Sequence, residues 1–380
     1  MLYQPSDDTN LILSNIKKFA KGSVLDMGTG TGALAREAHL HCSNVTAVDI
    51  NPKAITYAKE NSPKTIKFVE SDLFTNVKDQ FELIIFNPPY LPEDKREDVG
   101  SALATTGGKQ GFEIIERFLE DANNYLTPDG QILLLFSSLT NKDKVDELIT
   151  KNLYGFKMVE TKMLSMFEQL YLYSLQKTKL LQQLKEVSDL KFFAKGHRGY
   201  IYTGKYQKKA VTVKLKNPKS KASGRIKNEI ETLKVLNKHK IGPNLIKSTN
   251  DYFIYDFVEG EFMPMYIRDE RDKTKIRKHL IDLLNQMYTL DKLKINKEEM
   301  HHPHKHILIK NKAVLLDFEK ANKSTKPHNV TQFCQYLCSL KPVLKQKGIF
   351  VNITKIRELS RVYKKKYDEK AFNEIVKSIS

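Results

Sequence analysis

This 380-residue chain is predicted to fold as a doubly wound α/β unit with a mostly parallel sheet, followed by a separate α+β unit. In the first half, short apolar runs end in polar or glycine-rich turns, and helical patterns follow. The halves also differ in charge: residues 1–178 hold 19 Lys and Arg against 24 Asp and Glu, whereas residues 179–380 hold 44 against 21. A hydrophobic content of 40 % is enough for two cores. We therefore expect two domains, at 1–178 and 179–380.

The first predicted βα unit carries a glycine-rich turn. A strand over Ser23–Met27 runs into Gly28-Thr-Gly-Thr-Gly32, and a helix over about Ala33–Leu40 follows. Glycines in such a turn let the backbone approach a ligand closely, as in nucleotide-binding folds. Some structural turns have the same spacing, so this turn alone leaves the ligand open.

Polar side chains stand at the carboxyl ends of the next predicted strands. Asp49 follows a strand over 44–48, and Asp72 follows a strand over 66–70. The carboxyl ends of neighbouring parallel strands meet at the crevice where ligands bind. There Asp49 can accept both hydroxyls of a ribose, and Asp72 can accept the amino group of an adenine. Each aspartate alone also fits a solvated turn or a helix cap, but the ordered series predicts a nucleoside cofactor.

The tetrad Asn87-Pro-Pro-Tyr90 follows the apolar strand Phe81–Phe86. Two consecutive prolines fix φ at about −65° and remove two N–H groups. The side-chain carbonyl of Asn87 and the backbone carbonyl of Pro88 can then accept both N–H groups of a planar nitrogen, while Tyr90 stacks on its plane. Positioning such a nitrogen in line with a methyl sulfonium supplies most of the rate acceleration. The tetrad therefore predicts methylation of a planar nitrogen; the alternative is an ordinary proline-rich turn.

Residues 1–177 resemble the HemK-type methyltransferases, which use S-adenosylmethionine (SAM) to methylate the glutamine of a GGQ motif in translation release factors. The resemblance is to their short archaeal and eukaryotic branch. Besides the tetrad, it rests on Tyr3-Gln-Pro-Ser-Asp-Asp-Thr9, on Thr106-Gly-Gly-Lys-Gln-Gly111 and on a late strand at Glu168–Tyr173. The chain departs from the family at Ala104-Thr-Thr106, where an aromatic residue or Ala-Trp is common, and it has no Trp. The resemblance implies an α/β Rossmann-like class I methyltransferase with a mostly parallel seven-stranded sheet.

The resemblance also implies roles for single residues. Asn87, Pro88 and Tyr90 would hold the target nitrogen. The cofactor-binding set that it implies is Asp8, Thr9, Asp26, Gly28, Gly30, Asp49, Asp72 and Asn87. Members of this branch usually work with a small zinc-binding activator subunit, so such a partner is implied. The same tetrad occurs in methyltransferases of adenine or guanine bases, which leaves a tRNA, rRNA or DNA base open as an alternative acceptor, with the basic second half docking the nucleic acid.

The second half begins near Lys177–Leu181 with helical periodicity over Leu180–Leu190. Strands are predicted over 191–194, 200–206, 210–215 and 307–309, and helices over about 223–239 and 271–290. Lys214 lies in the strand Val-Thr-Val-Lys-Leu, Glu229 on the next helix is placed to pair with it, and Asp317 ends a later strand.

This order resembles the compact atypical protein kinases of archaea, the lineage that includes the RIO kinases. The resemblance implies an α+β bilobal protein-kinase-like domain that binds ATP, with Mg²⁺ held at Asp317. The ATP and metal set that it implies is Gly196, Lys214, Glu229, Glu299, His306 and Asp317. The usual catalytic loop is replaced: His306 stands where an Asn binds the second metal ion, and Glu298, Glu299 and His301 remain open as the base. Kinase activity, ATP hydrolysis and a scaffold role also remain open.

Composition limits the setting and the partners. The second half has a net charge of +23 against −5 for the first, which predicts binding to tRNA or ribosomal RNA; a lysine-rich genome is the alternative. No apolar run is long enough for a membrane span, and the first residues do not resemble a signal peptide. The three cysteines form no C-x-x-C pair. We expect a cytoplasmic protein without membrane contact.

Overall fold

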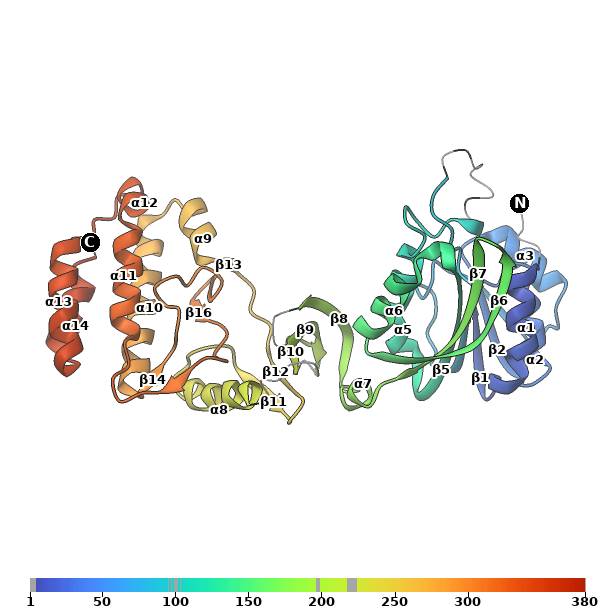
Figure 1. Cartoon of the computed structure of the whole chain (residues 1–380), viewed down its shortest axis with the longest axis horizontal. Helices are drawn as coiled ribbons and strands as arrows, with labels where there is room; N and C mark the ends of the chain where they lie inside the picture. The colour runs from blue at the N-terminus through green and yellow to red at the C-terminus, as the bar shows by residue number, and fades with distance from the viewer. Residues whose placement is uncertain are drawn as a thin grey trace. The chain divides into compact units, whose positions relative to one another are not determined.

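The computed structural model describes residues 5–94, 96, 98, 102, 104–195, 199–216 and 224–379 (Figure 1). Contacts divide the chain into two compact units, Met1–Phe192 with Gly204–Gln207 and Phe193–Thr203 with Lys208–Ser380. This division falls after the predicted join, so the domain bounds 1–178 and 179–380 stay a prediction. None of the described helices is long and apolar enough to cross a membrane.

The first unit is built on one sheet. Within the described residues this sheet has seven strands in the order β3-β2-β1-β4-β5-β7-β6. The strands are β1 (Ser23–Met27), β2 (Asn44–Asp49), β3 (Lys67–Glu70), β4 (Phe81–Phe86), β5 (Leu126–Ser137), β6 (Tyr154–Ser165) and β7 (Glu168–Lys177). The first five are parallel, and β7 is antiparallel to β5 and β6. The predicted mostly parallel sheet is confirmed, and its strand order reverses between β1 and β4, where such sheets form a ligand crevice.

Helices cover both faces of this sheet. They are α1 (Asp7–Phe19), α2 (Ala33–His39), α3 (Pro52–Glu60), α5 (Glu113–Tyr125), α6 (Lys142–Lys151) and α7 (Lys179–Gln183), with a 3₁₀ turn at Ser138–Thr140. Side chains alternate between the faces of a strand. In β4, Leu83 and Ile85 therefore join the core formed with α1 and α2. Phe86 points to the opposite face, where its ring lies 4.4 Å from that of Phe118 in α5.

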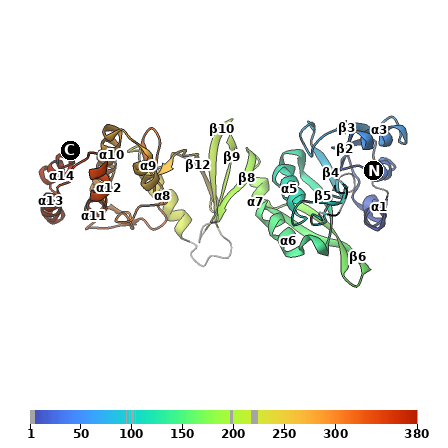
Figure 2. The ribbon, with the colours of Figure 1, turned by 90° about the horizontal axis from the view of Figure 1, so that it is seen from above.

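The second unit is a mixed α+β structure. In the part that the structure describes, a five-stranded sheet has the order β11-β12-β10-β9-β8, and its strands β10, β11 and β12 lie wholly in the second unit. Strand β12 is antiparallel to β10 and β11; β8, β9, β10 and β12 are labelled in Figure 2. The strands are β8 (Val187–Lys195), β9 (Gly199–Tyr206), β10 (Lys209–Lys216), β11 (Leu245–Ser248) and β12 (Tyr252–Asp256). Two small sheets pair β13 (Glu261–Phe262), β15 (Ile307–Ile309) and β16 (Ala313–Leu315), and β14 (Ile295–Asn296) with β17 (Asn322–Lys323).

The helices of the second unit contribute to one apolar core with these small sheets. They are α8 (Arg225–Asn237), α9 (Met263–Asp269), α10 (Lys273–Lys292), α11 (Asn329–Ser339), α12 (Lys341–Gln346), α13 (Ile353–Lys366) and α14 (Glu369–Lys377). Buried Asp291 of α10 accepts hydrogen bonds from Asn329 Nδ2 and from the Tyr363 hydroxyl, at 2.7 and 2.9 Å. These bonds tie α10 to α11 and α13.

The predicted helical stretch over Leu180–Leu190 is wrong in its second half. Helix α7 ends at Gln183, and β8 begins at Val187. Asp189 has a φ of 52°, which a helix cannot accommodate. The apolar spacing of the leucines matched a helix, whereas strand pairing determined the structure that followed.

Candidate active site

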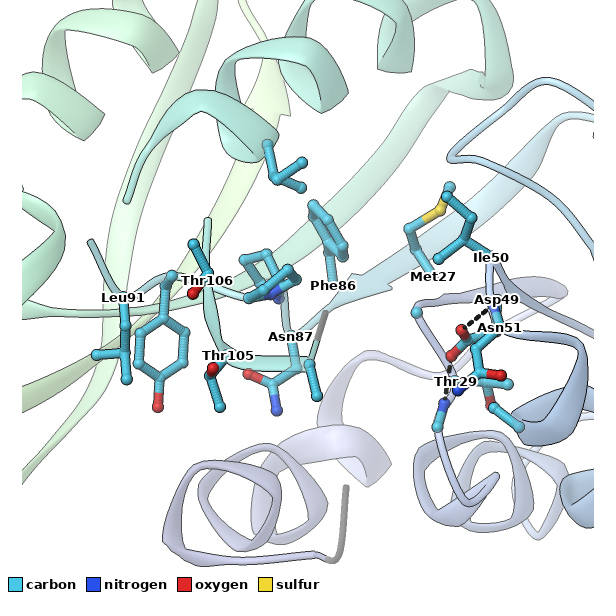
Figure 3. A pocket seen from close by; sticks show the side chains of 18 of the residues that line it. Met27, Thr29, Asp49, Ile50, Asn51, Phe86, Asn87, Leu91, Thr105 and Thr106 are labelled. Atoms are coloured by element: carbon cyan, nitrogen blue, oxygen red, sulfur yellow. Dashed lines mark hydrogen bonds between the residues drawn. The ribbon is translucent and has the colours of Figure 1, made fainter. Parts of the chain in front are cut away.

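A cavity of ≈ 1080 Å³ lies at the carboxyl ends of β1, β2 and β4, where the strand order reverses (Figure 3). The sequence-predicted residues that line it are Asp8, Thr9, Gly28, Gly30, Asp49, Asp72, Asn87, Pro88 and Tyr90. They come from α1, from the last residue of β2 and from the turns after β1, β3 and β4, so the fold brings them together at one edge of the sheet. Asp26 does not belong to the lining residues among those described.

The glycine turn leaves space beside the cavity. Gly28 and Gly30 have φ values of +68° and +55°, which favour glycine. A Cβ atom at Gly30 would meet nothing within 4 Å, and one at Gly28 would meet only Phe86 at 3.8 Å. Neither glycine is needed for packing, so both serve the path of the backbone along the cavity.

Two aspartates hold this turn from different sides. Buried Asp26 accepts hydrogen bonds through Oδ2 from Thr29 Oγ1 at 2.6 Å and from the Ala35 N–H at 3.0 Å. Asp49 accepts from the N–H groups of Gly30 and Asn51, each at 2.8 Å. Burial raises the pKa of Asp26 to about 6 and also raises the pKa of Asp49. Asp26 Oδ1 is buried and has no partner among the described residues.

Asp72 is paired with a residue that the sequence analysis missed. Its Oδ2 accepts a hydrogen bond from Arg117 Nη2 at 2.8 Å, and both side chains are about half exposed. Both residues line the cavity. Arg117 lies on α5, 45 positions along the chain, and no local pattern indicates this pairing.

The tetrad is held by its neighbours at several points. Asn87 Nδ2 donates to Asp8 Oδ2 at 3.0 Å, while Asn87 Oδ1 is buried without a partner in the described structure. The Tyr90 carbonyl accepts a bond of 2.9 Å from Thr140 Oγ1, another residue that the sequence analysis missed. Leu91 N donates to Thr105 O at 2.8 Å, and Thr105 is drawn near Asn87 in the view of Figure 3.

The segment Thr106–Gly111 packs directly on the tetrad. A Cβ atom at Gly107 would come within 2.6 Å of Pro89 O, and one at Gly111 within 2.5 Å of Tyr90 O. Side chains at these two positions would disturb the packing of the segment against the tetrad. The glycines of this motif therefore have a packing role next to the site, which motif spacing alone did not reveal.

These groups fit a methyl donor that contains a nucleoside, such as SAM. The oxygens of Asp49 retain lone pairs for ribose hydroxyls, since each carboxylate oxygen accepts more than one bond. The glycine turn leaves room for the ligand, and the unpaired Oδ1 of Asn87 offers an acceptor at the tetrad. Donor and acceptor chemistry is thus present for a cofactor and a neighbouring N–H group.

The second unit has a separate charged cluster. Lys214 Nζ of β10 lies 2.7 Å from Glu229 Oε2 of α8, 3.6 Å from Asp317 Oδ1 and 3.9 Å from Glu319 Oε2. Burial alone lowers the pKa of Lys214, but the carboxylates of Glu229 and Asp317 raise it overall. In the described part of the chain, Glu229, Asp317 and Glu319 are the acidic group close enough together to hold a cation, and His306 is not part of it.

A second set of charged residues also lies near Asp317. His306 Nε2 is 3.2 Å from Glu299 Oε2, and Lys320 also pairs with Glu299. Buried Lys297, which the sequence analysis missed, donates to Leu316 O at 2.7 Å and to Asp317 O. Burial lowers the pKa of Lys297 to about 8.

Two residues of this second cluster have a left-handed backbone. Asp317 and Glu299 have φ values of 58° and 71°, in the left-handed region that residues other than glycine rarely adopt. Such strain persists only where surrounding contacts impose it, and it is often found at functional sites. The predicted Gly196 lies outside the described residues.

Known proteins resemble parts of this chain. A family model described as the methyltransferase small domain matches residues 5–163. A putative protein N5-glutamine methyltransferase of Methanocaldococcus jannaschii is 41 % identical over 177 residues, which is 44 % of this chain and 88 % of that protein. A release factor glutamine methyltransferase of Deinococcus radiodurans is 36 % identical over 136 residues, 33 % of this chain and 49 % of that protein. The chain thus spans about half the length of this second relative.

Similar solved structures were also found. The Mtq2–Trm112 complex of E. cuniculi, described as methylating the termination factor eRF1, matches with 23 % identity and a TM-score of 0.39, over 47 % of this chain and 99 % of that chain. A co-crystal structure of WbdD with a kinase inhibitor matches with 14 % identity and a TM-score of 0.39, over 88 % of this chain and 81 % of that chain.

The close relative decides the family, because 41 % identity extends over nearly the whole of that protein. The family model and the parallel sheet agree with it, and the cofactor of this family is SAM. The predicted enzyme class and cofactor are confirmed. This chain belongs to the HemK-type family of SAM-dependent protein-glutamine methyltransferases.

Proposed function

We propose that the first unit methylates the glutamine amide in the GGQ motif of a translation release factor. The observation that carries this proposal is the buried Oδ1 of Asn87, which has no partner in the described structure and belongs to a residue that lines the cavity. An amide nitrogen offers the two N–H donors that Asn87 Oδ1 and the Pro88 carbonyl require. The relative named as a release factor glutamine methyltransferase also supports this acceptor.

The residues act mainly by positioning the acceptor. Asn87 Oδ1 and Pro88 O accept the two N–H groups of the glutamine amide, and the ring of Tyr90 packs on the amide plane. When bound, SAM supplies an electrophilic methyl group on a sulfonium. The amide nitrogen held by Asn87 and Pro88 would accept this methyl group and would lose one proton to water. Orientation of this kind is worth several orders of magnitude in rate.

Transfer of labelled methyl from SAM to an archaeal release factor tests the acceptor. Label is expected in the release factor, and it should disappear when the glutamine of its GGQ motif is replaced by asparagine. Asn87→Ala should lower kcat by on the order of 10²-fold or more. The matched control is Asn61→Ala, because exposed Asn61 bonds only Tyr57 O of its own helix in the described structure.

Bulk tRNA belongs in the same assay, since a nucleic-acid base is the alternative acceptor. Label in tRNA and none in the release factor would overturn the proposal. The small zinc-binding activator that the family resemblance implies stays a prediction. Adding such a subunit to the assay and finding a higher rate than with the chain alone would support it.

We propose as a second function that the second unit is a protein-kinase-like domain that binds ATP with Mg²⁺. Support comes from the 2.7 Å pair of Lys214 and Glu229, from Asp317 near Lys214, and from the strained backbone at Asp317. In such a site Lys214 contacts the nucleotide phosphates and Asp317 holds the metal ion.

Lys214→Ala should weaken ATP binding by about tenfold or more in titration calorimetry with Mg²⁺. Lys209→Ala is the matched control, because Lys209 is an exposed lysine on the same strand. Equal affinity of both variants would contradict this assignment.

The net charge of +23 over residues 179–380 supports RNA as a partner of the second unit. Binding through phosphates releases counterions, so the affinity for tRNA should fall steeply with salt. A flat salt dependence, measured by fluorescence anisotropy with the full chain, would exclude this mode of binding.

A further inference from the structure

Asp8 and Asn87 form a buried pair at the cavity. Asp8 lies in the first turn of α1 and is 3 % exposed. Its Oδ1 accepts from Ser6 Oγ and from the Thr9 N–H, each at 2.6 Å, and its Oδ2 accepts from Asn87 Nδ2 at 3.0 Å. Local donors thus hold one oxygen, and the other oxygen faces the tetrad.

The pair determines which end of the Asn87 amide faces the acceptor. An asparagine amide has a donor end and an acceptor end of nearly the same shape, whereas an ionised carboxylate only accepts. Rotating the Asn87 amide by half a turn would place its oxygen against Asp8 Oδ2 and present N–H groups where the acceptor brings its own donors. Two opposed donors and two opposed acceptors would both be unfavourable in a buried site.

We propose that Asp8 is a positioning residue for methyl transfer: it keeps Asn87 Oδ1 directed at the N–H groups of the glutamine. This differs from the cofactor contact that the family resemblance implies for Asp8. The carboxylate also places a negative charge one hydrogen bond away from Asn87, which polarises the amide and strengthens its oxygen as an acceptor. The amide nitrogen of the glutamine substrate becomes more positive as the methyl group arrives. A stronger acceptor at Asn87 Oδ1 therefore favours the transition state. The inference rests on the proposed role of Asn87.

Asp8→Asn separates positioning from shape. The new amide keeps the size of the side chain but can pair with Asn87 in either orientation. We expect kcat to fall by on the order of 10²-fold, while the Kd for SAM, measured by calorimetry, changes less than about threefold. Asp7→Asn is the matched control, because exposed Asp7 precedes Asp8 in the same helix and pairs with Lys162 at 2.8 Å. A wild-type kcat in Asp8→Asn, or a loss fully explained by weaker SAM binding, would overturn the proposal.

A second measurement needs no acceptor protein. In a ¹⁵N–¹H correlation spectrum, the side-chain NH₂ pair of Asn87 is assigned by its disappearance in Asn87→Ala. Asp8→Ala should shift this pair, because one N–H loses its carboxylate, and thermal unfolding should show that the variant is folded. An unchanged pair in folded Asp8→Ala would sink the inference. Failure of the release-factor assignment has a different signature: no label in the release factor with the wild-type enzyme, whatever the spectrum shows.

Discussion

At the cavity of the first unit, one buried acceptor atom, Asn87 Oδ1, has no partner in the described part of the chain. At the cluster of the second unit, by contrast, the ammonium and carboxylate groups pair with each other, as Lys214 does with Glu229 and Lys320 with Glu299, although His306 Nδ1 there is also buried without a partner among the described residues. Unpaired buried acceptors are costly, so the first site is prepared for a donor that the ligand supplies. A ligand of the second site has to replace existing ion pairs. We therefore call the first site a preformed mould, because an acceptor in it lacks a donor until a ligand binds. We call the second site a closed network of charges, because its ammonium groups already pair with carboxylates.

The largest expected effect tests how rigid the first site is. Gly107→Ala brings a Cβ atom within 2.2 Å of Gly111 O and 2.6 Å of Pro89 O, so the packing of this segment on the tetrad has to change. A displacement of about 1 Å can cost on the order of 10²-fold in rate, and we expect kcat to fall by at least that factor. Gly155→Ala is the matched control, since its Cβ would meet nothing within 4 Å. Equal methyl-transfer rates for the two variants would show that the first site is not a preformed mould.

The closed network of the second unit should respond to alkali. The folded-state pKa of Lys297 is about 8, below the ordinary value of 10.5, so its charged form is disfavoured in the fold. Between these values the unfolded chain binds more protons, and stability therefore rises with pH. The unfolding free energy of the wild type, measured relative to that of Lys297→Met, should rise by about 3 kcal/mol from pH 7.5 to pH 10.5. Denaturant titrations at both pH values measure it, with the exposed Lys305→Met as control. A constant difference would show that Lys297 is not buried as a strained cation.

The first unit should respond to acid instead. Burial raises the pKa of Asp26 to about 6 from 3.8, so the folded protein binds more protons between these values and becomes more stable as the pH falls. Asp26→Asn removes this gain. The wild type should therefore gain up to about 3 kcal/mol relative to the variant between pH 6.5 and pH 4, measured by denaturant titration. If the unfolding free energies of the two proteins changed with pH in parallel, the burial of Asp26 would be contradicted.

The smallest effect is expected at the rim of the cavity. Asp72 and Arg117 form a half-exposed pair, and such pairs contribute at most about 1 kcal/mol. Arg117→Gln should leave the unfolding free energy within that range and change SAM affinity by no more than a few fold. A much larger loss of SAM binding in calorimetry would mean that Arg117 itself contacts the cofactor.

Sequence patterns predicted the strand ends and the glycine turn of the first site better than the long-range hydrogen bonds between its residues. Strand ends and the glycine turn follow from local apolar runs and local turn chemistry, so Asp49 and Asn87 could be placed at the sheet edge before the structure. The contact from Asp8 to Asn87 joins residues 79 positions apart, and Thr140 reaches Tyr90 across 50 positions. Such contacts depend on how helices pack on the sheet, and no local pattern encodes them.

The same limit applies to the second unit. The spacing of Lys214 and Glu229 on a strand and the next helix was visible in the sequence, and the structure places them 2.7 Å apart. The burial of Lys297 was not visible in the sequence, because a lysine in a polar stretch gives no sign of being buried. Its position depends on β14 and on the turn at Asp317, which are brought together only in the folded unit.

The strand order of the first unit has a consequence for biosynthesis. Every strand of its seven-stranded sheet comes from residues up to Lys177, and the sheet contains no strand from later in the described chain. The ribosome delivers residues in order, and amino-terminal domains generally fold first. The methyl-transfer site can thus be assembled while the basic second unit is still being translated.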